Sequence, residues 1–186
     1  MNLYSRSIVF LVVSCLVPAC SEEISSEAHL NSAKAYLEQS DSNAAIVELK
    51  NALTKDVNNT RARAMLGRVY FDAGAFEDAE KELSKALASG VDTSVVVPVL
   101  AEVLLSLGEY EKLDNLTLDG LAPGSRSTVQ AAKGLAMVYR NDMVAASEIM
   151  EAALQNEPNS DYAQVAAARL AMANGEYDAA RVRLQA

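Results

Sequence analysis

The chain has 186 residues, enough for one ordinary domain or one short array of repeats. It contains no Trp, three Phe and four Pro, and 51% of its residues are hydrophobic, which favours close-packed helices and excludes a disordered chain. Its 16 Lys and Arg against 25 Asp and Glu give a net charge of −9, which excludes nucleic acid as the expected partner because an acidic surface repels phosphates.

The N-terminus is predicted to be an export signal that covers residues 1–19. Arg6 supplies a positive charge, and Ile8–Val17 is an apolar stretch too short to span a bilayer comfortably. The two cysteines of the chain, Cys15 and Cys20, both lie at this end, so neither can staple a folded domain. An ordinary signal peptide with a chance cysteine, or an uncleaved anchor, is the alternative.

The residues Val17-Pro18-Ala19-Cys20 resemble the lipobox of bacterial lipoproteins. The resemblance implies that the signal is removed before Cys20, which then carries fatty acyl chains such as palmitate on its sulfur and its amino group. Several acyl chains hold a protein on a membrane durably, whereas one chain does so only marginally. In Gram-negative lipoproteins, a residue other than Asp after the cysteine, here Ser21, is typical of sorting to the outer membrane. We expect a periplasm-facing protein with residues 20–26 as a short tether.

The rest of the chain repeats at an interval of 34 residues. Ala33, Gly67 and Ala101 follow this step. The same interval separates Tyr36 from Tyr70, Ala45 from Ala79, Ala52 from Ala86, Gly134 from Ala168 and Ala146 from Ala180. The step from Ala101 to Gly134 is 33, so the third unit has lost one residue.

A turn motif recurs within the repeats. Gly74, Gly108 and Gly175 are each followed two residues later by an aromatic residue and then by acidic residues. Glycine readily takes the left-handed conformation that ends a helix, and acidic residues favour the N-terminus of the next helix. Small residues at the eighth and twentieth places of a unit would let two helices approach closely. The pattern predicts tandem helix-turn-helix hairpins.

Two series of residues resemble the signature of the tetratricopeptide repeat (TPR): Leu66-Gly67, Tyr70, Ala79, Leu83 and Ala86, and then Gly134, Ala146, Ala153 and Pro158. The resemblance implies an all-α solenoid of antiparallel helix hairpins, with about four and a half repeats wound into a right-handed superhelix. We predict that this solenoid covers residues 27–186, with units at about 27–59, 60–93, 94–126 and 127–160 and an incomplete unit at 161–186.

The third and fifth units depart from the signature. The third has Leu113 where a small residue is usual and Gly120 where alanine is usual, and we expect Leu118–Ser127 to be irregular around Pro123-Gly124, with a short or tilted second helix. In the fifth unit a second helix is expected to begin near Tyr177, with no polar capping helix after it. Because solenoids need caps for solubility, the sequence suggests either a longer parent protein or a partner that covers this end.

A narrower resemblance lies in the first two units. The segments 44–53, 58–67 and 79–83 are similar to the opening repeats of the TPR lipoprotein family associated with PEP-CTERM/exosortase systems. The likeness covers about Met1–Gly108. It implies a role in exopolysaccharide production or in C-terminal protein sorting in Gram-negative bacteria.

The sequence contains no combination of residues typical of an enzyme. It lacks the Gly-x-Ser-x-Gly, Walker and His-Glu-x-x-His motifs, and its one histidine, His29, is interpreted as a half-exposed residue in a first helical turn. Four acidic residues are interpreted as a solvated helix face, because helical spacing spreads them apart: Glu77, Asp78, Glu80 and Glu82. Three methionines are interpreted as core residues: Met137, Met143 and Met150. We therefore expect no enzymatic activity, no cofactor and no metal.

The remaining candidate site is the groove of the solenoid. The TPR resemblance implies that the second, fifth, sixth, ninth and twelfth places of each unit face this groove. Those places include Asn31, Lys34, Arg61, Met65, Arg68, Phe71, Val99 and Glu102. Lys34 and Arg68 stand one repeat apart and predict a positive strip beside Met65 and Phe71, suited to a peptide that carries carboxylates. The alternative is that these are ordinary solvated residues.

Taken together, the residues predict a membrane-anchored scaffold of the cell envelope that binds other proteins or peptides, in exopolysaccharide production or PEP-CTERM/exosortase sorting. A lipoprotein that assembles pili or outer-membrane proteins is the alternative, and the neighbouring genes would separate the two. An enzyme or a direct polysaccharide binder ranks lower, because sugar binding usually needs aromatic platforms.

Overall fold

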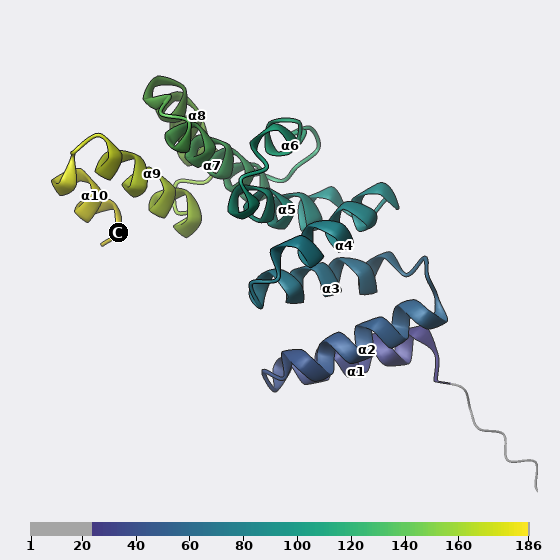
Figure 1. Ribbon diagram of the computed structural model, residues 1–186. Coiled ribbons are helices and arrows are strands. Elements are labelled where there is room, and N and C mark those ends of the chain that lie inside the picture. The colour runs from purple at the N-terminus through teal and green to yellow at the C-terminus, as the bar shows by residue number, and fades with distance from the viewer. Residues whose placement is uncertain (1–23, 186) are drawn as a thin grey trace, which may run out of the picture.

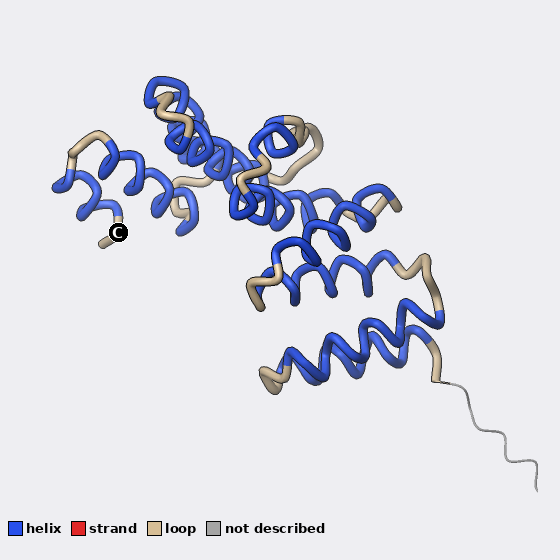
Figure 2. The backbone as a smooth tube through the Cα atoms, in the orientation of Figure 1, coloured by secondary structure: helices blue, strands red, loops and turns tan. Residues whose placement is uncertain are grey.

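The computed structural model describes residues 24–185, which form a curved stack of helix hairpins (Figure 1). These residues contain ten α-helices and no strand (Figure 2). The helices are α1 (Ser26–Glu38), α2 (Ser42–Lys55), α3 (Thr60–Asp72), α4 (Phe76–Ala88), α5 (Thr93–Leu107), α6 (Tyr110–Asp114), α7 (Pro123–Tyr139), α8 (Met143–Asn156), α9 (Asp161–Ala173) and α10 (Tyr177–Arg183). The predicted all-α solenoid is confirmed. The predicted export signal and Cys20 lie outside the described residues.

Short polar side chains begin most of the helices. The first amide groups of a helix have no partner within it, and a side-chain oxygen just before the helix can accept a hydrogen bond from one of them. The residues that do so are Ser25 for α1, Asp41 for α2, Asn59 for α3, Asp92 for α5, Asp142 for α8 and Ser160 for α9. These caps fix where those six helices begin.

Each hairpin turns at a residue with left-handed backbone. The three motif glycines, Gly74, Gly108 and Gly175, have φ of 75°, 72° and 81°. Ser40 and Asn141 occupy the same place in the first and fourth hairpins, with φ of 60° and 61°. A left-handed conformation is unfavourable for residues with a Cβ atom, so the repeat imposes this turn even where glycine is missing.

Small residues allow the two helices of a hairpin to lie close together, as the sequence predicts. A Cβ atom added to Gly67 of α3 would lie 2.6 Å from Leu83 Cγ and 3.1 Å from the Leu83 backbone nitrogen of α4. A Cβ atom added to Gly134 of α7 would lie 2.9 Å from Cε of Met150 on α8. The obstacle at Gly67 includes the main chain, whereas the nearest one at Gly134 is the end of a flexible side chain.

We expect Gly67→Ala to destabilise the protein by about 1–3 kcal/mol, the usual cost of overpacking a close-packed core. Gly134→Ala is the matched control. There the Met150 side chain can move away, and replacing a helical glycine by alanine stabilises the folded state by about 0.5–1 kcal/mol. Urea unfolding followed by circular dichroism would measure both variants. Equal losses of stability would contradict the assigned difference.

The third hairpin has a very short second helix, as the sequence predicts. α6 has five residues, and α5 packs extensively on α7. The buried side chains of Leu113 and Leu121 help to join these helices in the central core. The expected irregular stretch at Leu118–Ser127 is wrong in its second half, because α7 begins at Pro123. Proline has no amide hydrogen and a helical φ, so it starts a helix favourably.

The first helices of successive hairpins form one row. α3, α5, α7 and α9 contact one another in sequence, and the second helix of each hairpin packs beside them. Within residues 24–185, no helix is long and apolar enough to cross a membrane. The row of first helices carries the places that the repeat assigns to the groove.

Candidate binding face

The ninth place of each unit marks a line across the first helices. Following the repeat, this place is occupied by Lys34, Arg68, Glu102, Leu135 and Arg169. We call the surface of α1, α3, α5, α7 and α9 around this line the inner face. Its residues come from five different hairpins, so the solenoid alone brings them together.

At the N-terminal end of the inner face, the predicted arginines are already paired with carboxylates. Arg68 Nε donates to both carboxylate oxygens of Asp72, at 3.0 and 3.1 Å, and its guanidinium lies 5.6 Å from the centre of the Phe71 ring. Arg61 Nη2 donates to Glu27 at 2.8 Å. The positive strip is therefore weaker than the number of its cations suggests.

The other predicted groove residues differ in exposure. Asn31 and Lys34 are exposed on α1, and Met65 and Phe71 are half-buried on α3. The side chain of Val99 is 7% exposed and belongs to the central core, so it presents a guest with very little surface. Whether any of them contacts a partner stays a prediction.

Glu102 is a half-buried carboxylate near the middle of the inner face. Among residues 24–185, no hydrogen bond or ion pair reaches its carboxylate oxygens. Burial raises the pKa of the Glu102 carboxyl above its usual value, while the charge of Arg68 lowers it and that of Asp72 raises it. The fold thus holds a carboxylate in an unfavourable environment without a close partner of its own.

Tyr162 of α9 is close enough to Glu102 for the charge of this carboxylate to act on the tyrosine hydroxyl. Burial, followed by the charge of Glu102, raises the pKa of the Tyr162 hydroxyl above its usual value. The charge of Arg169 lowers that pKa and that of Tyr139 raises it, so three groups act on the Tyr162 hydroxyl. The cluster draws on α5, α7 and α9.

A pocket of about 410 Å³ opens next to this cluster. It is lined by Leu105, Ser106, Leu107, Gly108, Tyr110, Tyr139 and Arg169. The rings of Tyr110 and Tyr139 stack with centres 6.3 Å apart, and the Arg140 guanidinium lies 5.3 Å from the centre of the Tyr110 ring. The two tyrosine rings and the leucines of the lining can hold an apolar side chain, and the Arg169 guanidinium can hold an acidic group.

Lys133 of α7 and Arg140, the residue that follows α7, hold the short helix α6, which carries Tyr110. Lys133 Nζ donates to the backbone carbonyls of Asp114 at 2.9 Å and Leu116 at 2.8 Å, and Arg140 Nη1 donates to the Asp114 carboxylate at 2.7 Å. Burial lowers the pKa of the Lys133 ammonium, whereas the Asp114 charge raises it. The ammonium thus satisfies two carbonyls of the kind that the amides of a longer α6 would satisfy.

We expect Lys133→Met to destabilise the protein by about 1–3 kcal/mol, because two backbone carbonyls lose a charged donor. In the same variant, the amide hydrogens of residues 110–116 should exchange faster. Lys112→Met is the control, since Lys112 is half-exposed and reaches Glu80 only at 3.4 Å, and it should change stability by less than about 1 kcal/mol. Unchanged exchange in Lys133→Met would show that α6 does not depend on this ammonium.

Comparison with known proteins identifies the family. A family model described as tetratricopeptide repeat matches residues 36–103 and 138–186. The chain belongs to the tetratricopeptide repeat family. The unmatched residues between the two segments include the short helix α6 and the loop that follows it.

Solved structures agree with the tetratricopeptide repeat fold. MamA from Desulfovibrio magneticus RS-1 is 15% identical, with 86% of this chain and 91% of that chain covered and a TM-score of 0.68. PilF of Pseudomonas aeruginosa is 27% identical, with coverages of 85% and 72% and a TM-score of 0.66. YrrB, described as a TPR protein with an unusual peptide-binding site, is 18% identical, with coverages of 85% and 82% and a TM-score of 0.59. No curated protein matches the chain.

Three residues of the inner face were not predicted from the sequence: Tyr139, Tyr162 and Arg169. Tyr162 and Arg169 occupy the second and ninth places of the fifth tetratricopeptide repeat, as Arg61 and Arg68 do in the second. Extending the same places to the last repeat would have found both. Tyr139 is at the thirteenth place, which the pattern does not assign to the groove.

Two interpretations of polar residues as exposed are wrong. His29 is 9% exposed rather than half-exposed, and its Nδ1 lies 2.6 Å from Glu48 Oε2. Glu82 is 8% exposed rather than solvated, because Arg63 Nη1 donates to it at 2.7 Å. Among residues 24–185, no group of three His, Cys, Asp or Glu side chains could hold a metal ion.

Proposed function

We propose that the protein is a lipid-anchored scaffold of the bacterial cell envelope that captures a segment of a partner protein on its inner face. The tetratricopeptide repeat fold supports a role in protein–protein interaction. The resemblance of Val17-Pro18-Ala19-Cys20 to a lipobox supports the anchor. The scaffold performs no chemistry of its own.

The observation that carries this proposal is the unpaired Glu102 carboxylate. A half-buried charge without a close partner lowers the stability of a fold, and such groups cluster at functional sites. A guest cation placed between Glu102 and Tyr162 would supply the missing partner, and guest carboxylates would meet Lys34 and Arg169. We infer a guest segment that carries both signs of charge and an apolar side chain for the pocket beside Tyr110.

Charge reversal tests the inner face directly. Lys34→Glu/Arg169→Glu should leave the helical content unchanged and reduce the recovery of a cross-linked partner from native cells by about tenfold. Lys81→Glu/Lys85→Glu is the control, because both lysines are exposed on α4, a second helix. Equal recovery with all three proteins would refute the assignment of the inner face.

The anchor has its own test. Cys20→Ser should move the protein from the membrane fraction to the soluble periplasmic fraction, because acyl chains can no longer be attached. Retention of this variant in the membrane fraction would support an uncleaved anchor instead.

Two pathways compete for this scaffold. Exopolysaccharide production or PEP-CTERM/exosortase sorting is supported by the likeness of residues 1–108 to that lipoprotein family. Assembly of pili or outer-membrane proteins is supported by the similarity to PilF, at 27% identity. A deletion strain that loses exopolysaccharide and keeps its pili would favour the first pathway, and the reverse phenotype would favour the second.

A further inference from the structure

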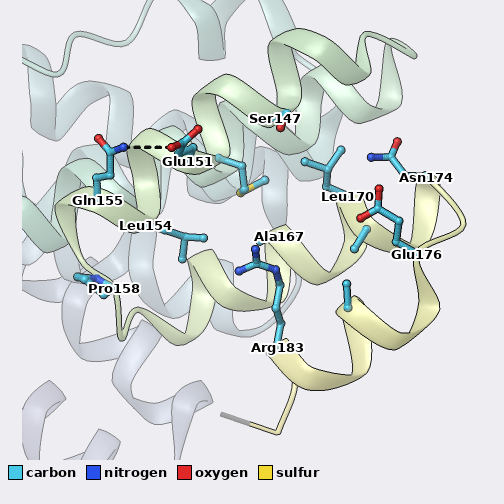
Figure 3. A pocket seen from close by; sticks show the side chains of 13 residues that line it. Ser147, Glu151, Leu154, Gln155, Pro158, Ala167, Leu170, Asn174, Glu176 and Arg183 are labelled. Atoms are coloured by element: carbon cyan, nitrogen blue, oxygen red, sulfur yellow. Dashed lines mark hydrogen bonds between the residues drawn. The ribbon is translucent and has the colours of Figure 1, made fainter.

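Three grooves lie at equivalent places of the repeat, away from the inner face. Each groove runs between the second helices of two successive hairpins, and the first helix of the later hairpin forms its floor. The walls are α2 and α4, α4 and α6, and α8 and α10, and the floors are α3, α5 and α9. Their volumes are about 430, 310 and 660 Å³. We call the last one the outer groove (Figure 3). Its apolar lining includes Met150, Leu154, Ala167, Leu170 and Ala171.

The residues of its floor explain why the outer groove is larger than the other two grooves. The two central floor positions hold Leu66 and Tyr70 in α3, Leu100 and Leu104 in α5, but Ala167 and Ala171 in α9. The spacing of the repeat makes these pairs equivalent. The alanines remove the side chains that fill the other two grooves, so α8 and α10 flank an apolar depression large enough for several side chains of a guest.

The rim of the outer groove is acidic. Glu151 of α8 and Glu176, just before α10, are both exposed and stand on different walls (Figure 3). The one lining cation, Arg183, donates to Gln164 at 3.3 Å. Two carboxylates against one guanidinium leave the lining with a net negative charge, which attracts positive charge.

The shape of the outer groove favours a helical guest. Its walls are helices, whose backbone groups are already hydrogen-bonded, so an extended segment would find few partners for its own backbone. A helix satisfies its backbone internally and can insert one apolar stripe between two flanking helices. The lining part of α8, residues 147–155, is about 12 Å long at 1.5 Å per residue, which suits a guest of two to three turns.

We propose that the outer groove is a second docking site, which binds a short amphipathic helix of a partner protein with leucine-sized residues on one face and Lys or Arg beside them. The apolar residues enter the space left by Ala167 and Ala171. The flanking cations meet Glu151 and Glu176. One solenoid could then hold two partners, one on each side of the stack.

A designed peptide tests this site on the full chain. The probe is a fluorescent helical peptide of about 14 residues with Leu at helical spacing and Lys elsewhere, and its counterpart has Glu in place of Lys. Fluorescence anisotropy should show saturable binding of the Leu/Lys peptide and about tenfold weaker binding of the Leu/Glu peptide. No saturable binding, or equal affinity for both, would overturn the proposal.

Two variants locate the binding. Ala167→Leu/Ala171→Tyr copies the floor of the α3 groove without changing any charge, and should weaken binding about tenfold. Glu151→Lys/Glu176→Lys changes only exposed residues, should weaken binding similarly, and decides the matter alone if the filled groove disturbs folding. Glu38→Lys/Glu77→Lys, on α1 and α4, is the charge-matched control and should bind within about twofold of the unmodified chain.

Other outcomes would assign the groove differently. Unchanged affinity of Ala167→Leu/Ala171→Tyr would mean that the peptide binds elsewhere by charge alone, which overturns the proposal. A dimer in sedimentation that this variant converts to a monomer would assign the outer groove to a second copy of the chain. Neither outcome affects the inner face, which Lys34→Glu/Arg169→Glu tests separately.

Discussion

Arg63→Met is expected to destabilise the protein by about 3 kcal/mol, because it leaves the Glu82 carboxylate buried without its main partner. The side chains of Arg63 and Glu82 are only 13% and 11% exposed, and their charged atoms lie 2.7 Å apart. Lys85 is a poor substitute, since it is half-exposed and 3.8 Å from Glu82. Urea unfolding at neutral pH, followed by circular dichroism, measures the loss.

Two further variants separate the burial of charge from the loss of packing. Arg63→Met/Glu82→Leu removes both charges and should recover about 2 kcal/mol of the loss, since an apolar pair of similar volume is often as stable as a buried ion pair. Arg61→Ala should cost less than about 1 kcal/mol, because the Arg61–Glu27 pair is exposed. A double variant as unstable as Arg63→Met would show that the charge of Glu82 is not the cause.

The same cross-link recurs in other hairpins at a separation of 19 residues. His29 reaches Glu48 at 2.6 Å in the first hairpin, and Arg183 donates to Gln164 at 3.3 Å in the fifth. In the third hairpin the equivalent residues are Val97 and Leu116, which are apolar. Each polar pair joins the first helix of a hairpin to the second, so together they help to set how the two helices face one another.

The sequence could predict the hairpins because local patterns determine them. The 34-residue interval and the small residue at Gly67 required two helices in close contact, and the structure places Leu83 there. The third hairpin was only half predictable. Its short second helix follows from Leu113 and Gly120, but the irregular stretch expected around Pro123 is helical from that residue on, because proline also starts helices.

Partnerships between distant residues could not be predicted in the same way. Glu82 and Glu80 lie two residues apart in one acidic run, yet only Glu82 faces Arg63. A helix pattern shows which face a residue is on, but not which side chain of another helix it meets. The cluster of Glu102, Tyr162 and Arg169 spans 68 residues of chain, so only the stacking of three hairpins brings it together.

Glu102→Gln is expected to make the protein more stable and a weaker binder. Because the folded-state pKa of Glu102 is raised, the folded chain binds the proton more tightly than the unfolded chain does. The ionised carboxylate therefore lowers stability above the raised pKa, and this cost disappears as pH falls below the usual carboxyl value of 4.5. Glutamine imitates the neutral form, so the variant should melt at a higher temperature at about pH 7 and lose this advantage at about pH 4.

The same substitution removes the charge that we expect a guest cation to meet. Loss of one partner from a desolvated charge pair costs about 2–5 kcal/mol of binding, so partner recovery at neutral pH should fall at least about tenfold. Glu111→Gln is the control, because Glu111 is exposed on α6, and it should change neither property. A purely structural Glu102 could change stability but not binding. Higher stability together with weaker binding in one variant would therefore indicate that the charge of Glu102 serves the partner. A Glu102→Gln chain that melts at a lower temperature and binds normally would contradict this role.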